Sequence, residues 1–557
     1  MEKAENRTKL NIVTVLILVA LTGIIFTVFQ VFYMPHDFDN LGGKHVWVSG
    51  STIKYVNMWL DEGASKLHFT NMEMFPSIET ATFDDRGPYV SYPTGVTFMV
   101  WTAAKLCGKT HIDVSFLKHF QLLMYGIEGI MLSVLIYVFS RFFLLINEKV
   151  RVVISLLVST IWITMPVNNW FLTNIYWTDM AVILWIIAYL LLECFSEVKD
   201  WSKKQKIVID ALKVLVIVAG VLTEYFFCIV VFLGFIFNIF YVWKTSDGKK
   251  LQNVFKKSLI YVIPVIIALL IYVWQMSCVS DWVDQLVETF LHRTGVSEAE
   301  NTSGMFEESF FNAITCDSKT RALLLGLVEL QWVIILGILA VKKKISDLIA
   351  NKCAISVVIM IIAPVVQLIL FGNHSAIHQY SMVKVGLHVV GILLLTMLAS
   401  YRLFKDYKNG IYLFATSGAV AIICILVAMG YPGRIKSFYE EKNRLLDYSI
   451  DEAIYENVNY EDVCFSYTYQ IPNNPPMDIC VAEKMVYIIQ DESEMNTMFP
   501  NLPDNARKVL VIDKVGKGSN AYGNIEKNEE ISLLEEQAVS DGKIIYEDEK
   551  CILVRMP

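Results

Sequence analysis

Residues 11–32, NIVTVLILVALTGIIFTVFQVF, form an uncharged apolar run that is long enough to cross a lipid bilayer as one α-helix. A short basic leader with Lys3, Arg7 and Lys9 precedes the run. The run is longer than the apolar core of a signal peptide, and residues 31–34 (VFYM) offer no pair of small residues for a signal peptidase. We therefore expect a retained membrane anchor.

Similar apolar runs recur along most of the chain. Of its 557 residues, 55% are hydrophobic and 18% are charged, whereas soluble domains carry about a quarter charged residues. Windowed hydropathy predicts a polytopic α-helical membrane protein with about eleven spans, which excludes a soluble enzyme. The run 207–243 is too long for one helix, so we divide it at Thr223–Glu224. The predicted spans lie near 11–32, 118–141, 150–167, 178–196, 207–222, 225–243, 258–277, 322–341, 353–371, 384–401 and 410–430.

Lysine and arginine residues predict how the helices are oriented. They gather in alternate connections, whereas the short connections near 168–177, 223–224 and 372–383 carry none. Because basic connections stay on the cytoplasmic side, the N-terminus is predicted to lie inside. The odd number of spans then places the C-terminus outside, in a multi-pass protein of the cell (plasma or inner) membrane.

Three large segments are predicted to lie outside: loops 33–117 and 278–321, and the tail 431–557. The tail differs in character from the apolar region 1–430, and we treat it as a second domain. Its alternating pattern predicts a small extracytoplasmic α/β domain. The expected strands are 462–469, 485–490, 508–513, 543–547 and 551–555, and the expected helices are 491–499 and 528–540.

Loop 33–117 concentrates the candidate chemistry. It opens with residues 34–40, MPHDFDN, which place two carboxylates next to the first span. An amphipathic stretch at 45–60 and a second apolar stretch at 93–107 follow. The second stretch is too short to cross a bilayer, which favours a helix lying on the membrane surface.

This arrangement resembles the GT-C superfamily of membrane glycosyltransferases, with the architecture of protein mannosyltransferases and aminoarabinose transferases. The resemblance covers the whole chain and is strongest between residues 33 and 110. The matching features are Asp37 and Asp39 after the first span, the helices 45–60 and 93–107, Tyr92-Pro93, and the tail 431–557.

The resemblance implies an inverting enzyme that takes a sugar from a polyprenyl-phosphate or diphosphate carrier. The acceptor would be an envelope glycan, lipid or protein on the outer face of the membrane. A hydroxyl that attacks an anomeric carbon needs a carboxylate within hydrogen-bond reach, so Asp37 is expected to be the general base. Asp39 is expected to support it or to face a metal. The alternative is that both residues cap the following helix.

Three residues are candidates for contact with the donor phosphate: Lys384, Arg86 and His378. A developing negative charge on the leaving phosphate calls for such groups. Lys384 could instead extend to the lipid headgroups. Arg86 could instead pair with Asp84 or Asp85, which is the common use of a loop arginine.

Four further residues are expected to line the same cavity: Asp179, Glu224, Tyr380 and His374. Asp179 could equally be a helix-start acid and Glu224 a turn residue facing water. His374 and His378 have the spacing of a metal-ligand pair, with hydrogen-bonded interfacial histidines as the alternative. No cofactor is assigned, and a divalent metal is left open. The chain carries no basic stripe for nucleic acid.

Other functions fit a polytopic membrane protein. A transporter or flippase of lipid-linked saccharides is one, although we see no internal repeats of the kind that transporters show. A non-catalytic envelope-assembly protein, with the tail as a docking module, is another. A polymer ligase would be favoured by basic residues in a late outer loop, but loop 278–321 is acid-rich.

Overall fold

The computed structural model describes most of the chain. The described residues are 11–34, 36, 38, 47–73, 84–143, 147–198, 201–246, 248–296, 319–341, 352–406, 415–422, 449–459, 461–467, 482–484, 486–489, 491–499, 502, 506–514 and 529–557.

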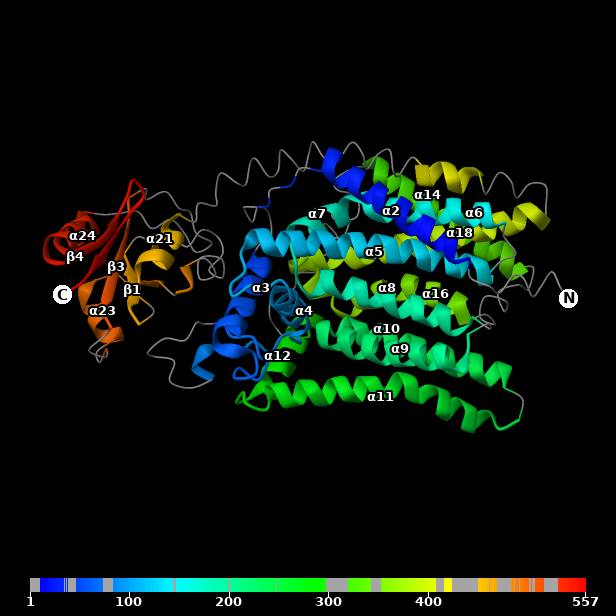
Figure 1. Cartoon of the computed structure of the whole chain (residues 1–557), viewed down its shortest axis with the longest axis horizontal. Helices are drawn as coiled ribbons and strands as arrows, with labels where there is room; N and C mark the ends of the chain where they lie inside the picture. The colour runs from blue at the N-terminus through cyan, green and yellow to red at the C-terminus, as the bar shows by residue number, and fades with distance from the viewer. Residues whose placement is uncertain are drawn as a thin grey trace.

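A bundle of long helices makes up the larger part of the described structure (Figure 1). Ten of these helices coincide with ten of the predicted spans; the eleventh, 410–430, is described only at 415–422. The ten are α2 (Ile12–Tyr33), α5 (Val114–Phe143), α6 (Glu148–Thr164), α8 (Thr178–Ser196), α9 (Lys203–Thr223), α10 (Phe226–Thr245), α11 (Lys250–Met276), α14 (Lys319–Val341), α16 (Lys352–Leu370) and α18 (Val385–Asp406).

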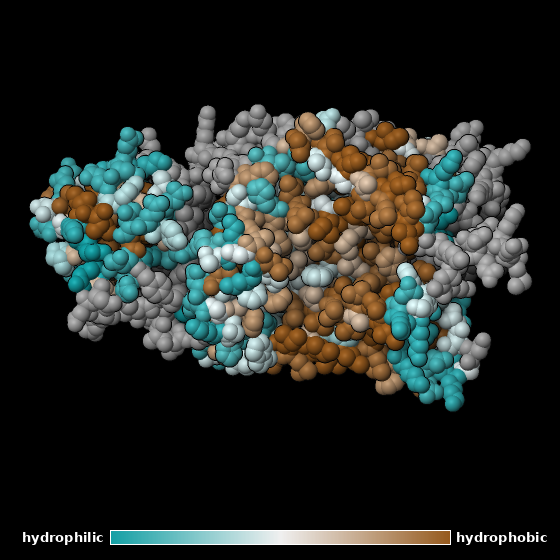
Figure 2. All heavy atoms as spheres, in the orientation of Figure 1, coloured by the Kyte–Doolittle hydropathy of each residue, from teal (hydrophilic) through white to brown (hydrophobic). Residues whose placement is uncertain are grey.

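Within the described part of the chain, six helices are long and apolar enough to cross a membrane. Figure 2 shows the apolar surface as a broad brown band over the middle of the bundle, with hydrophilic residues toward both ends. The six are Ile12–Tyr33, Val114–Arg141, Thr178–Ser196, Phe226–Thr245, Lys250–Met276 and Tyr380–Tyr401. A multi-pass helical membrane protein is therefore confirmed, whereas the number of spans and their direction stay predictions.

The long apolar run 207–243 folds as a helical hairpin, as predicted. Ser202 starts α9 with a capping box to Gln205. The helix stops at Thr223, where Glu224 takes extended backbone angles, and α10 begins at Phe226. The turn places the Glu224 side chain inside the protein, where it is only 4% exposed, so the alternative of a turn facing water is wrong.

Shorter helices gather at the end of the bundle that faces the tail (Figure 1). The two helices predicted in the first outer loop are present as α3, extended by η1, and as α4. Residues 48–58 of α3 are all buried, so this helix is not a surface helix as predicted. Helices α7, α12, α17 and η3 in the other connections were not predicted. Their bounds are α3 (Trp47–Met58), η1 (Trp59–Gly63), η2 (Asp84–Arg86), α4 (Gly95–Leu106), α7 (Pro166–Asn174), α12 (Trp282–Thr294), α17 (Gly372–Ile377) and η3 (Gln379–Lys384).

Gly95 lets α4 approach the end of α9 closely. A Cβ atom at this position would lie 2.5 Å from the carbonyl oxygen of Leu222 and 2.7 Å from the hydroxyl of Thr223. Only glycine fits such a contact without moving the backbone. The first outer loop is thereby held against the α9–α10 turn that carries Glu224.

The tail contains a three-layered α/β unit, as its pattern predicted. The five-stranded sheet has the order β2-β1-β3-β5-β4, with β1 parallel to β2 and β3, and β5 antiparallel to β3 and β4. One face packs against α23 and α24, and the other against α21, which was not predicted. The bounds are α21 (Ser449–Asn457), β1 (Val463–Ser466), β2 (Val486–Ile488), α23 (Glu492–Met498), β3 (Lys508–Asp513), α24 (Glu529–Asp541), β4 (Lys543–Glu547) and β5 (Cys551–Arg555).

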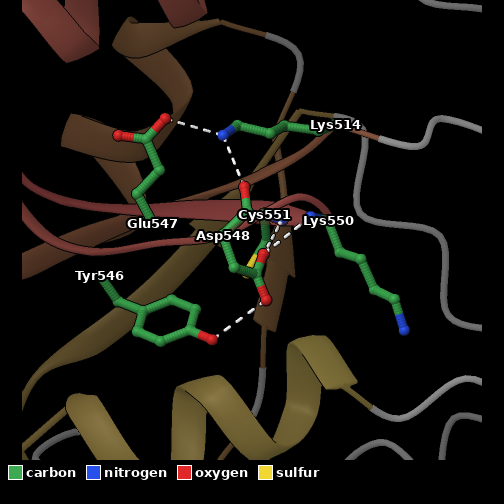
Figure 3. Close-up of polar contacts among 6 residues, drawn as sticks. All are labelled: Lys514, Tyr546, Glu547, Asp548, Lys550 and Cys551. Atoms are coloured by element: carbon green, nitrogen blue, oxygen red, sulfur yellow. Dashed lines mark hydrogen bonds and ion pairs between the residues drawn. The ribbon is translucent and has the colours of Figure 1, made fainter.

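A network around Asp548 fixes the turn between β4 and β5 (Figure 3). Its carboxylate accepts hydrogen bonds from the backbone N–H groups of Lys550 and Cys551, both at 2.7 Å, and from the hydroxyl of Tyr546 at 3.0 Å. Lys514 at the end of β3 donates to Glu547 at 2.8 Å. Local side-chain-to-backbone bonds of this kind define turns, so we assign this cluster a structural role.

Glu483 joins the tail to the first outer loop. Its Oε1 lies 3.4 Å from Nδ1 of His111 and accepts a hydrogen bond from Asn57 Nδ2 at 3.4 Å. The ring of Tyr455 on α21 lies 6.0 Å from the His111 ring. Burial raises the pKa of the Glu483 carboxyl to about 7, and the negative charge of Asp61 contributes to the rise.

Candidate functional site

Two adjoining cavities lie among the short helices, and we name them by their linings. The polar chamber has a volume of about 570 Å³. It is lined by Trp47, Glu73, Gly87, Pro88, Tyr89, Val90, Ser91, Tyr92, Gln285, Glu288, Thr289, His292, Arg293, His374, His378 and Tyr380. Four of these residues are Trp or Tyr, which combine an apolar ring face with a polar group.

The apolar chamber has a volume of about 350 Å³. Its lining includes five Leu, Val and Phe side chains, which come from α12, from α10 and from Phe371 just after α16. The full set is Tyr92, Glu224, Tyr225, Phe226, Leu286, Val287, Thr289, Phe290, Arg293, Gln367, Phe371 and His374. Tyr92, Thr289, Arg293 and His374 line both chambers, so the two spaces meet at these four side chains.

Arg293 brings a positive charge to this junction. It lies in the last turn of α12, just before Gly295 ends the helix in a left-handed conformation with φ of 74°. The guanidinium carbon lies 3.9 Å from the centroid of the Tyr92 ring, a cation–π contact. Stacking of this kind fixes the guanidinium plane while its N–H donors stay available to a ligand.

Two predicted histidines and Tyr92 form the wall beside Arg293. Tyr92 Oη lies 2.8 Å from His374 Nε2, and the rings of His374 and His378 lie 4.5 Å apart between centroids. Burial holds the pKa of His374 well below its usual value and lowers the pKa of His378 to about 4. Both imidazoles are therefore neutral at pH 7, so each offers a hydrogen bond but no positive charge.

Lys384 lies in a buried cluster beside the apolar chamber. Its Nζ is 2.7 Å from Oδ1 of Asp179 and 2.9 Å from Oε1 of Glu224. The three side chains are 1%, 0% and 5% exposed, respectively. Asp179 and Glu224 therefore lie next to each other at Lys384. Glu224 lines the apolar chamber, whereas Asp179 and Lys384 line neither chamber. Because Lys384 is buried, the alternative in which it reaches the headgroups is wrong. We call these three residues the Lys384 cluster.

Glu73 gives the polar chamber a carboxylate that is held in place on two sides. Lys54 donates to Glu73 Oε2 at 2.8 Å, and the hydroxyl of Tyr55 donates to its Oε1. Lys54 and Tyr55 are buried, whereas the Glu73 side chain is 38% exposed. Lys54 and Tyr55 therefore hold the Glu73 carboxylate in a fixed position, where it can accept hydrogen bonds from a group in the polar chamber.

Arg86 forms a bidentate ion pair with Glu62. Its two terminal nitrogens each donate to a carboxylate oxygen of Glu62 at 2.8 Å. Asp84 instead accepts hydrogen bonds from the backbone N–H and the hydroxyl of Ser280. Arg86 lines neither chamber, and its bidentate pair ties the end of η2 to η1.

The predicted catalytic acids Asp37 and Asp39 lie outside the described residues. Of the segment that carries them, His36 and Phe38 are described, and the Phe38 ring stacks on His119 with centroids 4.2 Å apart. Of the other predicted site residues, His378 and Tyr380 line the polar chamber, Glu224 lines the apolar one, and His374 lines both.

No metal ligand set is apparent in the described part of the chain, where no group of three or more His, Cys, Asp and Glu side chains is placed to hold a metal ion. Three acids in or beside the chambers are paired with lysines, Asp179 and Glu224 with Lys384 and Glu73 with Lys54. Glu288 also lines the polar chamber. The described residues therefore do not fit a resident metal.

Comparisons with known proteins bear on the fold. No family profile and no curated protein matches the sequence. Among solved structures, the chain is similar to the oligosaccharyltransferase of Archaeoglobus fulgidus, with 12% identity, a TM-score of 0.52, and coverage of 90% of this chain and 69% of that one. That enzyme has also been solved with dolichol-phosphate and an inhibitory peptide, and with zinc and sulfate.

A second similar protein is ArnT from Cupriavidus metallidurans. The apo structure matches with 10% identity and a TM-score of 0.52, and the structure bound to undecaprenyl phosphate matches with 12% identity and a TM-score of 0.50. Each match covers 97% of both chains. Both proteins are GT-C glycosyltransferases. The chain therefore has the GT-C fold, as the pattern of its first outer loop predicted.

Proposed function

We propose that this protein is a membrane glycosyltransferase that uses a sugar carried on a polyprenyl phosphate or diphosphate. The observation that carries the proposal is the junction of the two chambers at Arg293. An apolar space suits the first isoprene units, a cation suits the phosphate, and a polar, aromatic-lined space suits the sugar. Both similar proteins have been solved with a polyprenyl phosphate.

Arg293 is the better phosphate contact of the cations at this end of the bundle. Lys384 and Arg86, which the sequence suggested, each direct their charge at carboxylates. The neutral His378 and His374 are left to donate hydrogen bonds. A guanidinium can hold two phosphate oxygens at once, and it would stabilise the negative charge that the leaving phosphate develops.

The transfer is a single displacement with inversion. The acceptor oxygen bonds to the anomeric carbon while the bond from that carbon to the phosphate oxygen breaks. The electron pair leaves with the carrier phosphate, and the acceptor proton moves to the carboxylate of Asp37, with Asp39 in support. We place the reaction on the outer face, with an envelope glycan, lipid or protein as acceptor.

The test uses the purified full-length chain in nanodiscs and a panel of radiolabelled polyprenyl-phosphate sugars. We expect transfer or release of sugar from one donor. Asp37→Asn should lower turnover by about 10²- to 10⁴-fold without weakening donor binding. Arg293→Gln should weaken donor binding by about 10- to 100-fold, because it removes a charge-assisted contact.

Lys105→Gln is the matched control, because Lys105 is an exposed cation on α4 that lines neither chamber. It should leave both measurements unchanged. Donor binding that depends on Arg293 without any turnover would favour the transporter or flippase function. Absence of donor binding to the wild type would contradict the proposal and favour an assembly protein.

A further inference from the structure

The Lys384 cluster brings two carboxylates from different elements to one point. Asp179 stands in the first turn of α8, Glu224 in the turn between α9 and α10, and Lys384 at the end of η3. One carboxylate oxygen of each acid lies within 2.9 Å of the same nitrogen atom. Carboxylate oxygens that converge on one point are the ligands that hard divalent cations take in proteins.

We infer that Lys384 is a built-in counter-cation: its ammonium group fills the position between Asp179 and Glu224 that a divalent metal ion would otherwise take. This inference rests on the geometry of the cluster. Only its consequence for turnover rests on the proposed function.

Burial explains why a cation is needed at this point. Two carboxylates without a counter-charge are not stable inside an apolar helix bundle. Lys384 supplies one positive charge within 2.9 Å of an oxygen of each acid and donates a hydrogen bond to Oε1 of Glu224. The second oxygen of Glu224, Oε2, is buried and accepts no hydrogen bond from the described residues. The cluster thus keeps a coordination position that one amine does not use.

Charge balance points the same way. When both acids are ionised, they and Lys384 together carry one net negative charge, and Arg293 acts electrostatically on Glu224 across the apolar chamber. Lys384 and Arg293 therefore provide two single positive charges where one divalent ion would provide both. Unlike that ion, they are separated, so one holds the acids while the other faces the chamber junction.

A direct phosphate contact by Lys384 fits the structure less well. The amine is 1% exposed, and the ring of Phe226, which lines the apolar chamber, lies 4.9 Å from it. A phosphate would have to displace Asp179 or Glu224 to reach it. Lys384 is accordingly a positioning residue, which acts on the chamber through the two acids.

The experiment measures Mn²⁺ binding to the full-length protein in nanodiscs by electron paramagnetic resonance. The single variants Asp179→Asn and Glu224→Gln should bind the same number of Mn²⁺ ions as the wild type, because Lys384 already fills the position. Lys384→Ala should gain about one Mn²⁺ per chain, and Lys384→Ala/Asp179→Asn should lose it again. Mn²⁺ bound elsewhere contributes equally to all variants.

Thermal unfolding gives a second measurement. Mn²⁺ should raise the Tm of Lys384→Ala more than that of the wild type, since a ligand that binds the folded state stabilises it. A wild-type Mn²⁺ site that disappears in Asp179→Asn would overturn the inference, as would a folded Lys384→Ala that gains no site. If Lys384→Ala does not fold, Lys384→Gln, which removes the charge but keeps most of the side-chain volume, is measured in the same way, and a folded variant that gains no site would likewise overturn the inference.

Turnover separates this inference from the proposed function. If the protein is a glycosyltransferase, Mn²⁺ should restore part of the activity that Lys384→Ala loses. If no donor is ever turned over, the Mn²⁺ and Tm measurements remain, and they test Lys384 without reference to the reaction.

Discussion

Two buried lysines in the same helix bundle differ in what surrounds them. Lys384 lies between two carboxylates at the end of the bundle that holds the chambers. Lys213 on α9 lies 2.9 Å from one carboxylate, Glu193, with its amine 5.2 Å from the Tyr261 ring centroid. Asp179 and Glu193 both belong to α8, roughly 21 Å apart at 1.5 Å per residue.

The difference shows that burial alone does not mark a functional ion pair. Both lysines are almost fully buried, but only the Lys384 cluster contributes a residue, Glu224, to a chamber lining. The Lys213–Glu193 ion pair joins α9 to α8, and neither residue lines a chamber. A cluster with an excess acid beside a cavity leaves a charge that a ligand or a second cation must balance.

The largest expected effect on stability comes from replacing each of the two lysines in turn. Lys384→Met and Lys213→Met should each destabilise the protein by about 3–5 kcal/mol, because each leaves a buried carboxylate without its counter-charge. Only Lys384→Met should also lower turnover per folded molecule. Thermal unfolding together with a transfer assay normalised to folded protein measures both, and equal losses of turnover would abolish the distinction.

A smaller effect should follow when the partners are removed as well. Lys213→Met/Glu193→Leu should recover most of the lost stability, because an apolar pair of similar volume replaces a buried ion pair at little cost. Lys384→Met/Asp179→Leu/Glu224→Leu should regain stability without regaining turnover. The same two assays apply, and recovered turnover in the triple variant would show that the Lys384 cluster is only structural.

The smallest effect concerns Glu483, a half-buried acid of the tail for which the structure gives a histidine contact and no lysine pair. Its pKa is raised to about 7 when the tail contacts the first outer loop, so the contact favours the protonated acid. The contact should be strongest below about pH 4.5 and should weaken as the pH rises through 7. Burial also raises the pKa of Asp61, which adds to the weakening of the contact as the pH rises. Burial lowers the pKa of His111, which has the opposite effect on the pH dependence of the contact.

Hydrogen exchange of the amides in 449–459 measures this contact. Protection should fall between pH 6 and pH 8 in the wild type, and Glu483→Gln, which cannot ionise, should show a smaller fall. Asp491→Asn is the control, because Asp491 caps α23 away from the contact. An identical fall in the wild type and in Glu483→Gln would assign the pH dependence to other groups.

Local patterns in the sequence were enough to predict most elements. The hairpin at Thr223–Glu224 followed from the length of an apolar run, helix α3 from an amphipathic stretch, and helix α4 from an apolar stretch too short to span. The tail strands β3, β4 and β5 have the predicted bounds, because each is a short β-branched stretch between turn residues. These features depend on neighbours in the sequence, which a pattern can detect.

The site was only partly predictable, because its contacts join distant parts of the chain. Lys384 and Glu224 are 160 residues apart, and nothing near either residue indicates the other. Arg293 was missed because loop 278–321 was interpreted by its acidic charge. The apolar spacing of Val283, Val287 and Phe290 was the available signal: it predicts an amphipathic helix that would place Arg293 in its last turn.

The Lys384 cluster has a consequence for how the protein is assembled in the cell. A metal ion at such a position has to be taken up from the surroundings, and the fraction of molecules that hold it follows its free concentration. An amine carried by the chain is present in every copy from synthesis onward. Occupancy of the position between Asp179 and Glu224 is therefore set by translation and not by nutrient supply, and a chelator has nothing to remove from it.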